Sequence, residues 1–373
     1  MLDPAARINL NYPSLSKSKS MFNTYTRLTL FFLCFSVLLS AQDARYSQFY
    51  ANPLQLNPAM NGVFDGSFRF TANYKQQYSS LLKSNAYTSY ATGIEFRKNV
   101  NRGDFAAFSV SLQRDQAGMS KFTRTRGHIG GSFMKQLDGS RYRNNNKYLI
   151  VGAQVGLGQH SFDWSGLWFS RQFDNSNPSL PFINMDADPG ESLGEQNSNT
   201  YLDFNAGLLW YALFDDNMSI YFGGSINHLT TPNVAFMESA IEKLDSRYVV
   251  HAGGEIPFTE QLSILPAIVG MIQGPSMSST VGANFRYSNG ERNELAIRAG
   301  LWGHLSNQLE SQIGFEAVIV TAILELETLN VGFSYDITTS KLTEANNARG
   351  GMEVSLIYTQ PANRKQQMRC PNF

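Results

Sequence analysis

Apolar and polar residues alternate along most of this chain, from about Gly66 to Thr359, in segments of about 8–11 residues. The alternation is clearest in residues 68–75, 202–210, 281–287 and 329–336. Successive side chains of a β-strand point to opposite faces, so each segment would have one apolar face and one polar face. The pattern therefore predicts an all-β fold made of many strands.

Fourteen segments carry this pattern, and the turns between them contain Gly, Pro, Asn and Asp residues. The expected strands cover residues 67–75, 86–97, 104–115, 123–137, 147–162, 201–213, 218–229, 246–257, 262–273, 278–287, 293–302, 317–327, 329–337 and 350–359.

The alternation alone fits a half-buried soluble sheet and a membrane barrel equally well. The connections between these strands favour the barrel. Short turns and long loops alternate, as in outer-membrane barrels. The short ones include 214–217, 258–261 and 288–292, and the long ones include 163–200, 230–245, 303–316 and 338–349. The connection Gly274–Met277 breaks the rule, so a boundary or the strand number could differ there.

Aromatic residues on the apolar faces give the second argument for a barrel. They lie at segment ends, where a barrel carries its interfacial girdles, at Tyr74, Trp210, Tyr287, Tyr335 and Tyr358. Because lipid cannot satisfy backbone N–H and C=O groups, a spanning sheet must close on itself. We therefore expect a transmembrane antiparallel β-barrel of about 14 strands over residues 66–360, followed by a tail over 361–373.

The N-terminal region looks like an export signal. Arg27 precedes an apolar run, Leu28–Leu39, which is followed by Ser40 and Ala41. The run is shorter than the roughly 20 residues of a spanning helix, and a buried helix is the alternative. We predict a signal peptide over residues 1–41, with Met21 as a possible true start. Its removal would leave one cysteine, Cys370, and so no internal disulfide.

The segment over residues 42–65 is interrupted by prolines and cannot be a regular spanning strand. We expect it to lie in the barrel lumen or along the periplasmic rim, where it could offer a docking surface. The candidate partner-binding residues are Phe49, Tyr50, Asn52, Pro53, Asn57 and Pro58. Deletion of Gln42–Gly62 is then expected to spare membrane insertion but to abolish association with a partner.

The longest loop carries a second group of candidates for partner binding: Trp164, Trp168, Phe169 and Phe173. Exposed aromatics on a long loop can bind a protein, and they can equally pack on each other over the barrel mouth. The same loop contains Asp186, Asp188, Glu191 and Glu195, whose order does not match a calcium-binding loop. We interpret this acidic stretch as solvated.

No pattern in the chain indicates an enzyme, a cofactor or a metal site. The five histidines have no metal-ligand spacing, and His228, at a predicted strand end, is better suited to a structural hydrogen bond than to catalysis. Phosphate-binding glycine loops and nucleophile-elbow motifs are absent. Lys+Arg 30 balance Asp+Glu 30, which gives no support to nucleic-acid binding.

Several motifs make the chain resemble the PorP/SprF family of type IX secretion system membrane proteins. The similar stretches are Gln42–Leu54, Leu56–Ala59, Gly223–Pro232, His251–Gly254, Ile264–Gln273, Gly332–Ile337, Gly350–Leu356 and Cys370–Phe373. The resemblance covers nearly all of the chain after the predicted signal, and it is weakest at Trp168–Thr200.

The resemblance implies an outer-membrane component of the type IX secretion and gliding machinery. It implies as partners a large, adhesin-like secreted surface protein with a type IX sorting domain, periplasmic components linked to peptidoglycan, and outer-membrane lipid. The barrel would then anchor the surface protein. The alternative is a channel or small-solute transporter, because a barrel of this size can enclose a lumen. The inward positions mix both charge signs, for example Arg69 and Lys75 with Asp203 and Glu353, and fit either function.

Overall fold

The structure is a computed structural model that describes residues 43–361, apart from 102, 141–142, 177–181, 191–195, 215–217, 238, 290–294, 308–312. The predicted signal peptide and the predicted tail beyond Pro361 lie outside the described residues. Among the described residues, no helix is long and apolar enough to span a membrane.

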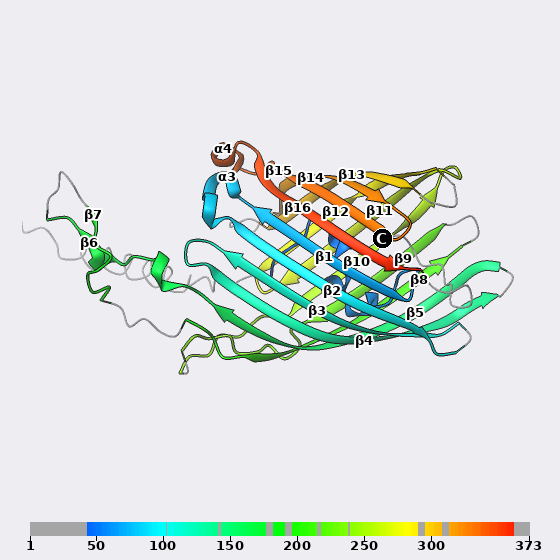
Figure 1. The fold of residues 1–373 in the computed structure, drawn as a ribbon, viewed down its shortest axis with the longest axis horizontal. Coiled ribbons are helices and arrows are strands. Elements are labelled where there is room, and N and C mark those ends of the chain that lie inside the picture. Colours follow the sequence, from blue (N-terminus) through cyan, green and yellow to red (C-terminus); the bar gives the residue numbers. More distant parts are fainter. Residues whose placement is uncertain are drawn as a thin grey trace, which may run out of the picture. The chain divides into compact units, whose positions relative to one another are not determined.

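Fourteen strands in the described part of the chain close into one antiparallel barrel (Figure 1). Each strand pairs with its neighbours in sequence, and β16 closes the ring on β1 with the register Phe68↔Gln360 to Gln77↔Gly351. The strands are β1 (Phe68–Gln77), β2 (Tyr87–Asn99), β3 (Phe105–Ala117), β4 (Phe122–Ser140), β5 (Arg143–Ser161), β8 (Tyr201–Leu213), β9 (Ser219–Asn227), β10 (Arg247–Pro257), β11 (Leu262–Gln273), β12 (Ser276–Ser288), β13 (Ala296–Asn307), β14 (Ile313–Glu325), β15 (Leu329–Thr338) and β16 (Arg349–Gln360).

All fourteen predicted strands are present, and the barrel prediction is confirmed. One predicted loop, 303–316, is wrong in extent, because β13 continues to Asn307 and β14 begins at Ile313. The pairing register of these two strands shifts between His304 and Leu305. Such an irregularity shifts side chains between the two faces, so the alternation fails locally although the strand continues.

The short connection near Gly274 is real. β11 ends at Gln273 and β12 begins at Ser276, so Gly274 and Pro275 alone form the turn. Gly274 has φ +53°, in the left-handed region that glycine adopts without strain. The predicted strand number therefore holds here. A tight hairpin joins these two strands at the end of the barrel where a long loop was expected.

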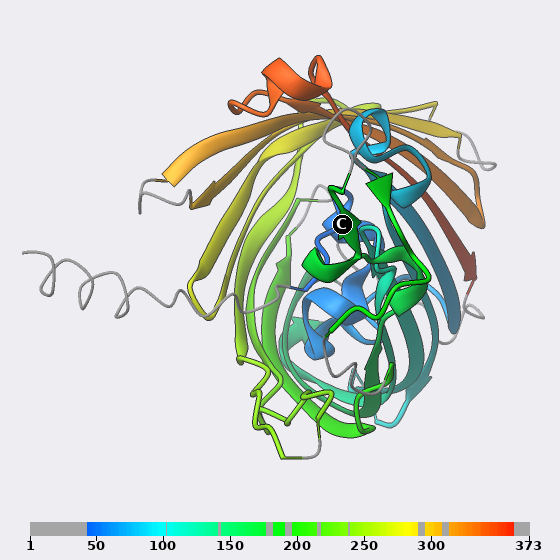
Figure 2. The same cartoon turned by 90° about the vertical axis from the view of Figure 1, so that its left-hand side faces the viewer.

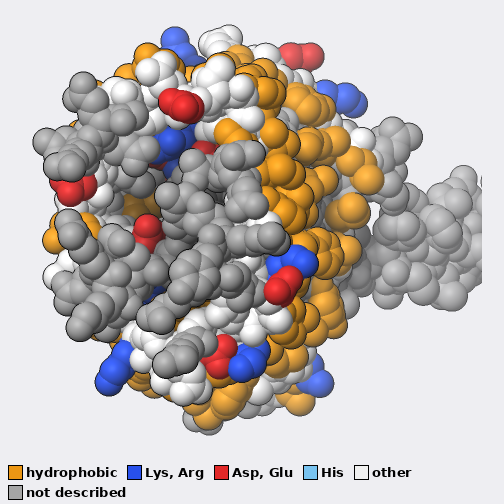
Figure 3. All heavy atoms as spheres, turned by 90° about the vertical axis from the view of Figure 1, so that its right-hand side faces the viewer, with side chains coloured by type: hydrophobic (Ala, Val, Ile, Leu, Met, Phe, Trp, Pro, Cys, Tyr) orange, Lys and Arg blue, Asp and Glu red, His pale blue; other side chains and the backbone are white. Residues whose placement is uncertain are grey.

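The barrel has an apolar outer face and a polar inner face, as the alternation predicts. Outward residues such as Leu202 and Phe204 are exposed, whereas Asp203 and Asn205 between them are buried. Figure 3 views the end opposite the β6–β7 loop, and hydrophobic side chains gather over one flank of the wall. This distribution suits a wall in contact with hydrocarbon.

Short helices lie in the N-terminal segment and in the loops, apart from the strands of the barrel wall. Three follow one another in the N-terminal segment: η1 (Phe49–Ala51), α2 (Pro53–Leu56) and η2 (Pro58–Met60). Proline begins α2 and η2, where its fixed φ suits a first helical position. The loops carry α3 (Ser79–Leu82), η3 (Lys83–Asn85), η4 (Trp164–Gly166), η5 (Ser170–Gln172), α4 (Thr343–Asn346) and a small sheet of β6 (Phe173–Asp174) and β7 (Phe182–Ile183).

Candidate functional site: the plugged barrel lumen

The described N-terminal residues 43–65, called the plug below, lie inside the ring of strands (Figure 2, blue). The plug begins at the end of the barrel that carries the long loops, where the backbone N–H of Asp43 donates to Gln273 Oε1 at 3.0 Å. It ends at the opposite, short-turn end, where Arg97 Nη1 donates to the carbonyl of Phe64. The plug therefore runs through the lumen from one end to the other.

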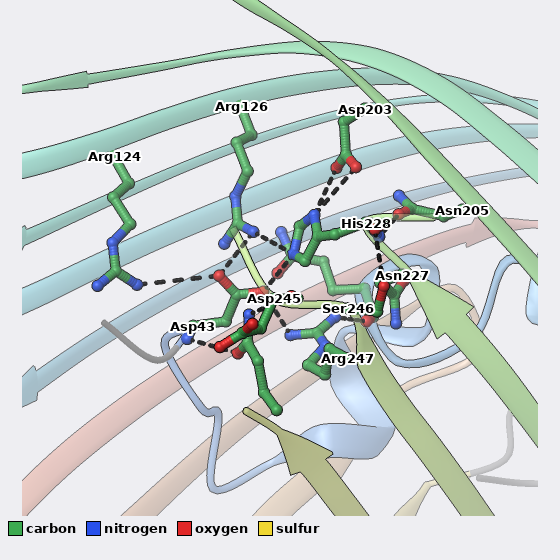
Figure 4. A network of polar contacts seen from close by, with 12 residues as sticks. Asp43, Arg124, Arg126, Asp203, Asn205, Asn227, His228, Asp245, Ser246 and Arg247 are labelled. Carbon is green, nitrogen blue, oxygen red and sulfur yellow. Dashed lines mark hydrogen bonds and ion pairs between the residues drawn. The ribbon is translucent and has the colours of Figure 1, made fainter. Parts of the chain in front are cut away.

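Asp43 holds the loop end of the plug in a cluster of wall cations (Figure 4). Its carboxylate lies 2.8 Å from Arg126, 3.2 Å from Arg247 and 3.8 Å from Arg124. His228 Nε2 lies 2.8 Å from Asp43 Oδ2, and His228 Nδ1 lies 2.9 Å from Asp203 Oδ1. Because both ring nitrogens face carboxylates, a protonated His228 can donate to both and bridge plug and wall.

The electrostatics of this cluster favour the charged forms. Burial by itself would raise the pKa of Asp43, but Arg126, His228 and Arg247 outweigh burial and hold that pKa well below its ordinary value. Burial would lower the pKa of His228, whereas Asp43 and Asp203 raise it above its ordinary value. A buried carboxylate and a buried imidazolium therefore stabilise each other inside the lumen.

A second polar anchor lies at Ser47 and Gln48. The backbone N–H of Ser47 donates to Glu353 Oε2 at 2.6 Å, and its hydroxyl donates to Asp336 at 2.7 Å. Lys75 donates to Ser47 Oγ at 2.7 Å and pairs with Asp336 at 3.2 Å. Gln48 Nε2 donates to the Glu353 carbonyl at 3.2 Å. Three charged wall residues are thus satisfied partly by the plug itself.

Asn57 forms the third anchor, against the backbone of the wall. Its side-chain amide donates to the carbonyls of Leu208 at 3.0 Å and Gly224 at 3.2 Å. A Cβ at Gly207 would lie 1.9 Å from Asn57 Oδ1. The glycine therefore permits the close approach of the plug to β8.

The short-turn end of the plug is held by a buried ion pair. Arg69 pairs with Glu95 at 2.7 Å, and Glu95 Oε2 accepts the backbone N–H of Gly62 at 2.9 Å. Ser132 donates its hydroxyl to the carbonyl of Asn61 at 2.6 Å. Wall side chains from β1, β2 and β4 thus satisfy plug backbone groups that no secondary structure pairs.

Aromatic packing closes the middle of the lumen. The ring of Phe49 contacts Trp302 edge-on at 5.3 Å and Tyr50 at 5.4 Å between centroids. Both plug aromatics belong to one buried cluster with Met60 of the plug and Ile150 of the wall. The packing leaves the plug fixed by apolar contacts as well as by its polar anchors.

The predicted plug residues Phe49, Tyr50, Asn52, Pro53, Asn57 and Pro58 are all buried and lie together in the lumen. Phe49 and Tyr50 pack near Trp302 of β13, and Asn57 donates to the backbone of β8 and β9. Their role in partner binding stays a prediction. These buried side chains would act by holding the plug in position, and not by forming an external surface.

The predicted loop residues are partly packed and partly exposed. Trp164 lies 4.2 Å from Phe162 and 6.2 Å from Phe169 between ring centroids. Trp168 and Phe173 stack loosely at 6.4 Å and are 48% and 46% exposed. The packing alternative is seen at Trp164, whereas Trp168 and Phe173 keep exposed faces. Protein binding by this loop stays a prediction.

Sequence reasoning did not single out Asp43, Arg124, Arg126 or Arg247, although these charges form the densest polar cluster of the site. The available signal was inward-facing arginines beside an acidic residue near the predicted mature N-terminus. His228 does make structural hydrogen bonds, as its place at a strand end suggested.

Among the described residues there is no group of three or more His, Cys, Asp or Glu residues placed to hold a metal ion. Glu191 and Glu195 lie outside the described residues, whereas Asp186 and Asp188 are described.

Comparison with known proteins gives one family match. Residues 38–358 match the model of the type IX secretion system membrane protein PorP/SprF. No curated protein matches.

Among solved structures, the chain is similar to several barrels. A TodX monoaromatic hydrocarbon channel mutant is 12% identical with a TM-score of 0.44, over 82% of this chain and 93% of that one. CdiB from Acinetobacter baumannii is 7% identical with a TM-score of 0.38, over 78% of this chain and 60% of that one. A Rh. blastica porin mutant is 10% identical with a TM-score of 0.29, over 78% of this chain and 99% of that one.

The family match covers the plug and almost all of the barrel, from before Asp43 to Tyr358 in β16. It agrees with the motifs found along the sequence and with the closed antiparallel barrel. The chain therefore belongs to the type IX secretion system membrane protein PorP/SprF family and is a β-barrel of the outer membrane.

Proposed function

We propose that this protein anchors an exported cell-surface protein to the outer membrane and couples it to periplasmic parts of the type IX machinery. The barrel fixes a position in the membrane. The long loops hold the surface protein, and the short-turn end, where the plug joins β1, contacts the periplasmic components. This role needs binding surfaces and no covalent chemistry.

The observation that carries the proposal is the occupied lumen. The plug places one apolar cluster inside it and contacts buried charged wall residues through Asp43, Ser47 and Gly62. A diffusive pore requires a hydrated path through the lumen. The packed plug leaves less room for such a path than an empty lumen would. A channel function would require the plug to leave the lumen and abandon those buried pairs.

The loop between β5 and β8 supports a binding face for the surface protein. Trp168 and Phe173 are each about half exposed, and large aromatic rings dominate the binding energy of many protein interfaces. Phe162 packs at 4.5 Å on Phe236 of the next long loop, which gives this region a fixed base. We propose Trp164 and Phe169 as supports and Trp168 and Phe173 as contacts.

The test is affinity purification of the tagged protein from gently solubilised outer membranes, with mass spectrometry of the co-purified proteins. A large exported surface protein together with periplasmic secretion components is the expected result. The double variant Trp168→Ser, Phe173→Ser should lose the surface protein and keep the periplasmic components.

A matched control is Ile241→Ser, since Ile241 is 80% exposed in the long loop between β9 and β10. It should retain both classes of partner. Recovery of the barrel alone from wild-type membranes would contradict the anchoring proposal, and equal loss in the control would contradict the assignment of the binding face.

A further inference from the structure

The outer wall of β16, β1, β2 and β3 contains an apolar hollow that the plug and the loops do not use. It measures about 1040 Å³, counting its open side, and its lining includes Ala72, Tyr74, Tyr90, Leu112 and Arg114. These residues have the outward parity of their strands, so the hollow faces the membrane and not the lumen.

The strand register explains the hollow. One row across the strands pairs Ala72 with Leu356 and Thr92, and Thr92 with Leu112. The hydroxyl of Thr92 donates to the carbonyl of Thr71 at 3.0 Å, which leaves its methyl group for the surface. The row on the short-turn side carries larger apolar side chains, including Phe70 and Ile94. Small residues between larger rows therefore form a depression of a kind that an acyl chain can fill.

Arg114 lies at the loop-side edge of this hollow. In the register it follows Tyr74 and Tyr90 in one row across the sheet, and the two tyrosine rings are 5.1 Å apart. The side chain of Arg114 is exposed and makes no hydrogen bond or ion pair with another described residue. An outward arginine is costly at the middle of a bilayer and nearly neutral at its interface. The residue thus marks the level of the lipid headgroups.

The next row towards the loops supports this level, because it is polar: Gln76 pairs with Thr88, and Thr88 pairs with Gln116. The loops above it are basic. The loop-side connections of this sector are β1–β2, β3–β4 and β15–β16. They contain three lysines, Lys83, Lys121 and Lys341, and one acid, Glu344. In contrast, the loop between β5 and β8 contains six acidic residues. Positive charge therefore gathers above the hollow and not evenly around the rim.

We propose that this hollow binds an acidic lipid of the leaflet on the loop side, with an acyl chain along Ala72 and Thr92 and a headgroup phosphate on Arg114. The apolar lining selects a hydrocarbon chain, and the arginine with the lysines above it selects the negative headgroup. The site is separate from the plug and from the proposed anchoring function.

Native mass spectrometry of the purified full-length protein tests the proposal. The protein is mixed with equal amounts of lipid A, which carries phosphate, and phosphatidylcholine, whose headgroup has no net charge. We expect a preference for lipid A. Arg114→Gln should reduce this preference about fivefold, the order expected for one cation at an anionic membrane surface. Ala72→Phe should fill the hollow and reduce lipid retention as well.

Two matched controls complete the experiment. Lys98→Gln removes an exposed cation at the short-turn end of β2, and Ala283→Phe adds the same ring to the outer face of β12. Neither should change the preference. Equal binding of both lipids, no effect of Arg114→Gln, or an equal effect of the controls would overturn the proposal. A photo-crosslinker at Thr92 that captures a protein instead of lipid in intact membranes would do so too.

Discussion

Individual residues in the lumen stabilise charge in a place where charge is costly. Asp43 and His228 are both buried, and each is stabilised by the opposite charge of the other and of its neighbours. Removing one member of a buried pair leaves an uncompensated charge, which costs on the order of 3–5 kcal/mol. The plug is therefore held by single residues whose substitution has measurable consequences.

The first prediction concerns pH. The pKa of His228 is raised, so its stabilising contribution is fully present below the ordinary value of 6.5 and is lost as the pH rises through the raised pKa. The pKa of Asp43 is lowered, so its contribution is present above 3.8 and is lost as the pH falls through the lowered pKa. We therefore expect the thermal midpoint in detergent to decrease as the pH rises above 6.5.

The measurement is the thermal midpoint of wild type and His228→Gln, followed as the pH is raised in steps from below 6.5. The variant should start lower and lose less over this range, because it lacks the titrating imidazole. Parallel curves for the two proteins would show that His228 does not carry the pH dependence.

The second residue prediction uses two glycines as a matched pair. Gly207→Ala places a Cβ 1.9 Å from Asn57 Oδ1, so the plug or β8 must shift. We expect a loss of about 1–3 kcal/mol in stability, the usual cost of overpacking. Gly270→Ala is the control, since nothing lies within 4 Å of its added Cβ. Equal thermal midpoints for the two variants would refute the close approach of Asn57.

At the scale of elements, strands were predictable from sequence and their internal partners were not. Alternation is a local property, so it identified each of the fourteen strands, but it missed the extent of β13 and β14 around the irregular pairing of His304 and Leu305. The plug has no such period. Asp43 and Arg247 lie far apart in the sequence, and no local pattern pairs them. Prolines showed that the plug is not a strand, but its path through the lumen depends on long-range contacts.

The element prediction is deletion of Gln42–Gly62. The barrel strands pair only with each other, so the variant should still insert and keep the faster gel mobility of a folded barrel before heating. It should unfold at lower temperature, because Glu353 and His228 lose partners in the plug. It should also lose its periplasmic partners on affinity purification.

Deletion of residues 170–175 in the long loop is the control for this experiment. It removes η5 and β6 and should leave the thermal midpoint and the periplasmic partners unchanged. Normal association of the plug deletion with periplasmic components would show that the plug has no part in coupling.

At the scale of the whole molecule, closure has two meanings. The ring of strands closes so that no backbone edge meets lipid, and the plug closes the ring from inside. The first follows from the sequence pattern and the membrane environment. The second supports the proposed role as a rigid attachment point, with loops on one side and the plug junction on the other.

The ionic conductance of the purified barrel in a planar bilayer tests this account most directly. The intact protein should show no steady conductance, whereas the variant without Gln42–Gly62 should open stable conducting steps of one size. Steady conductance by the intact protein, equal to that of the deletion variant, would contradict the closed lumen and favour a channel.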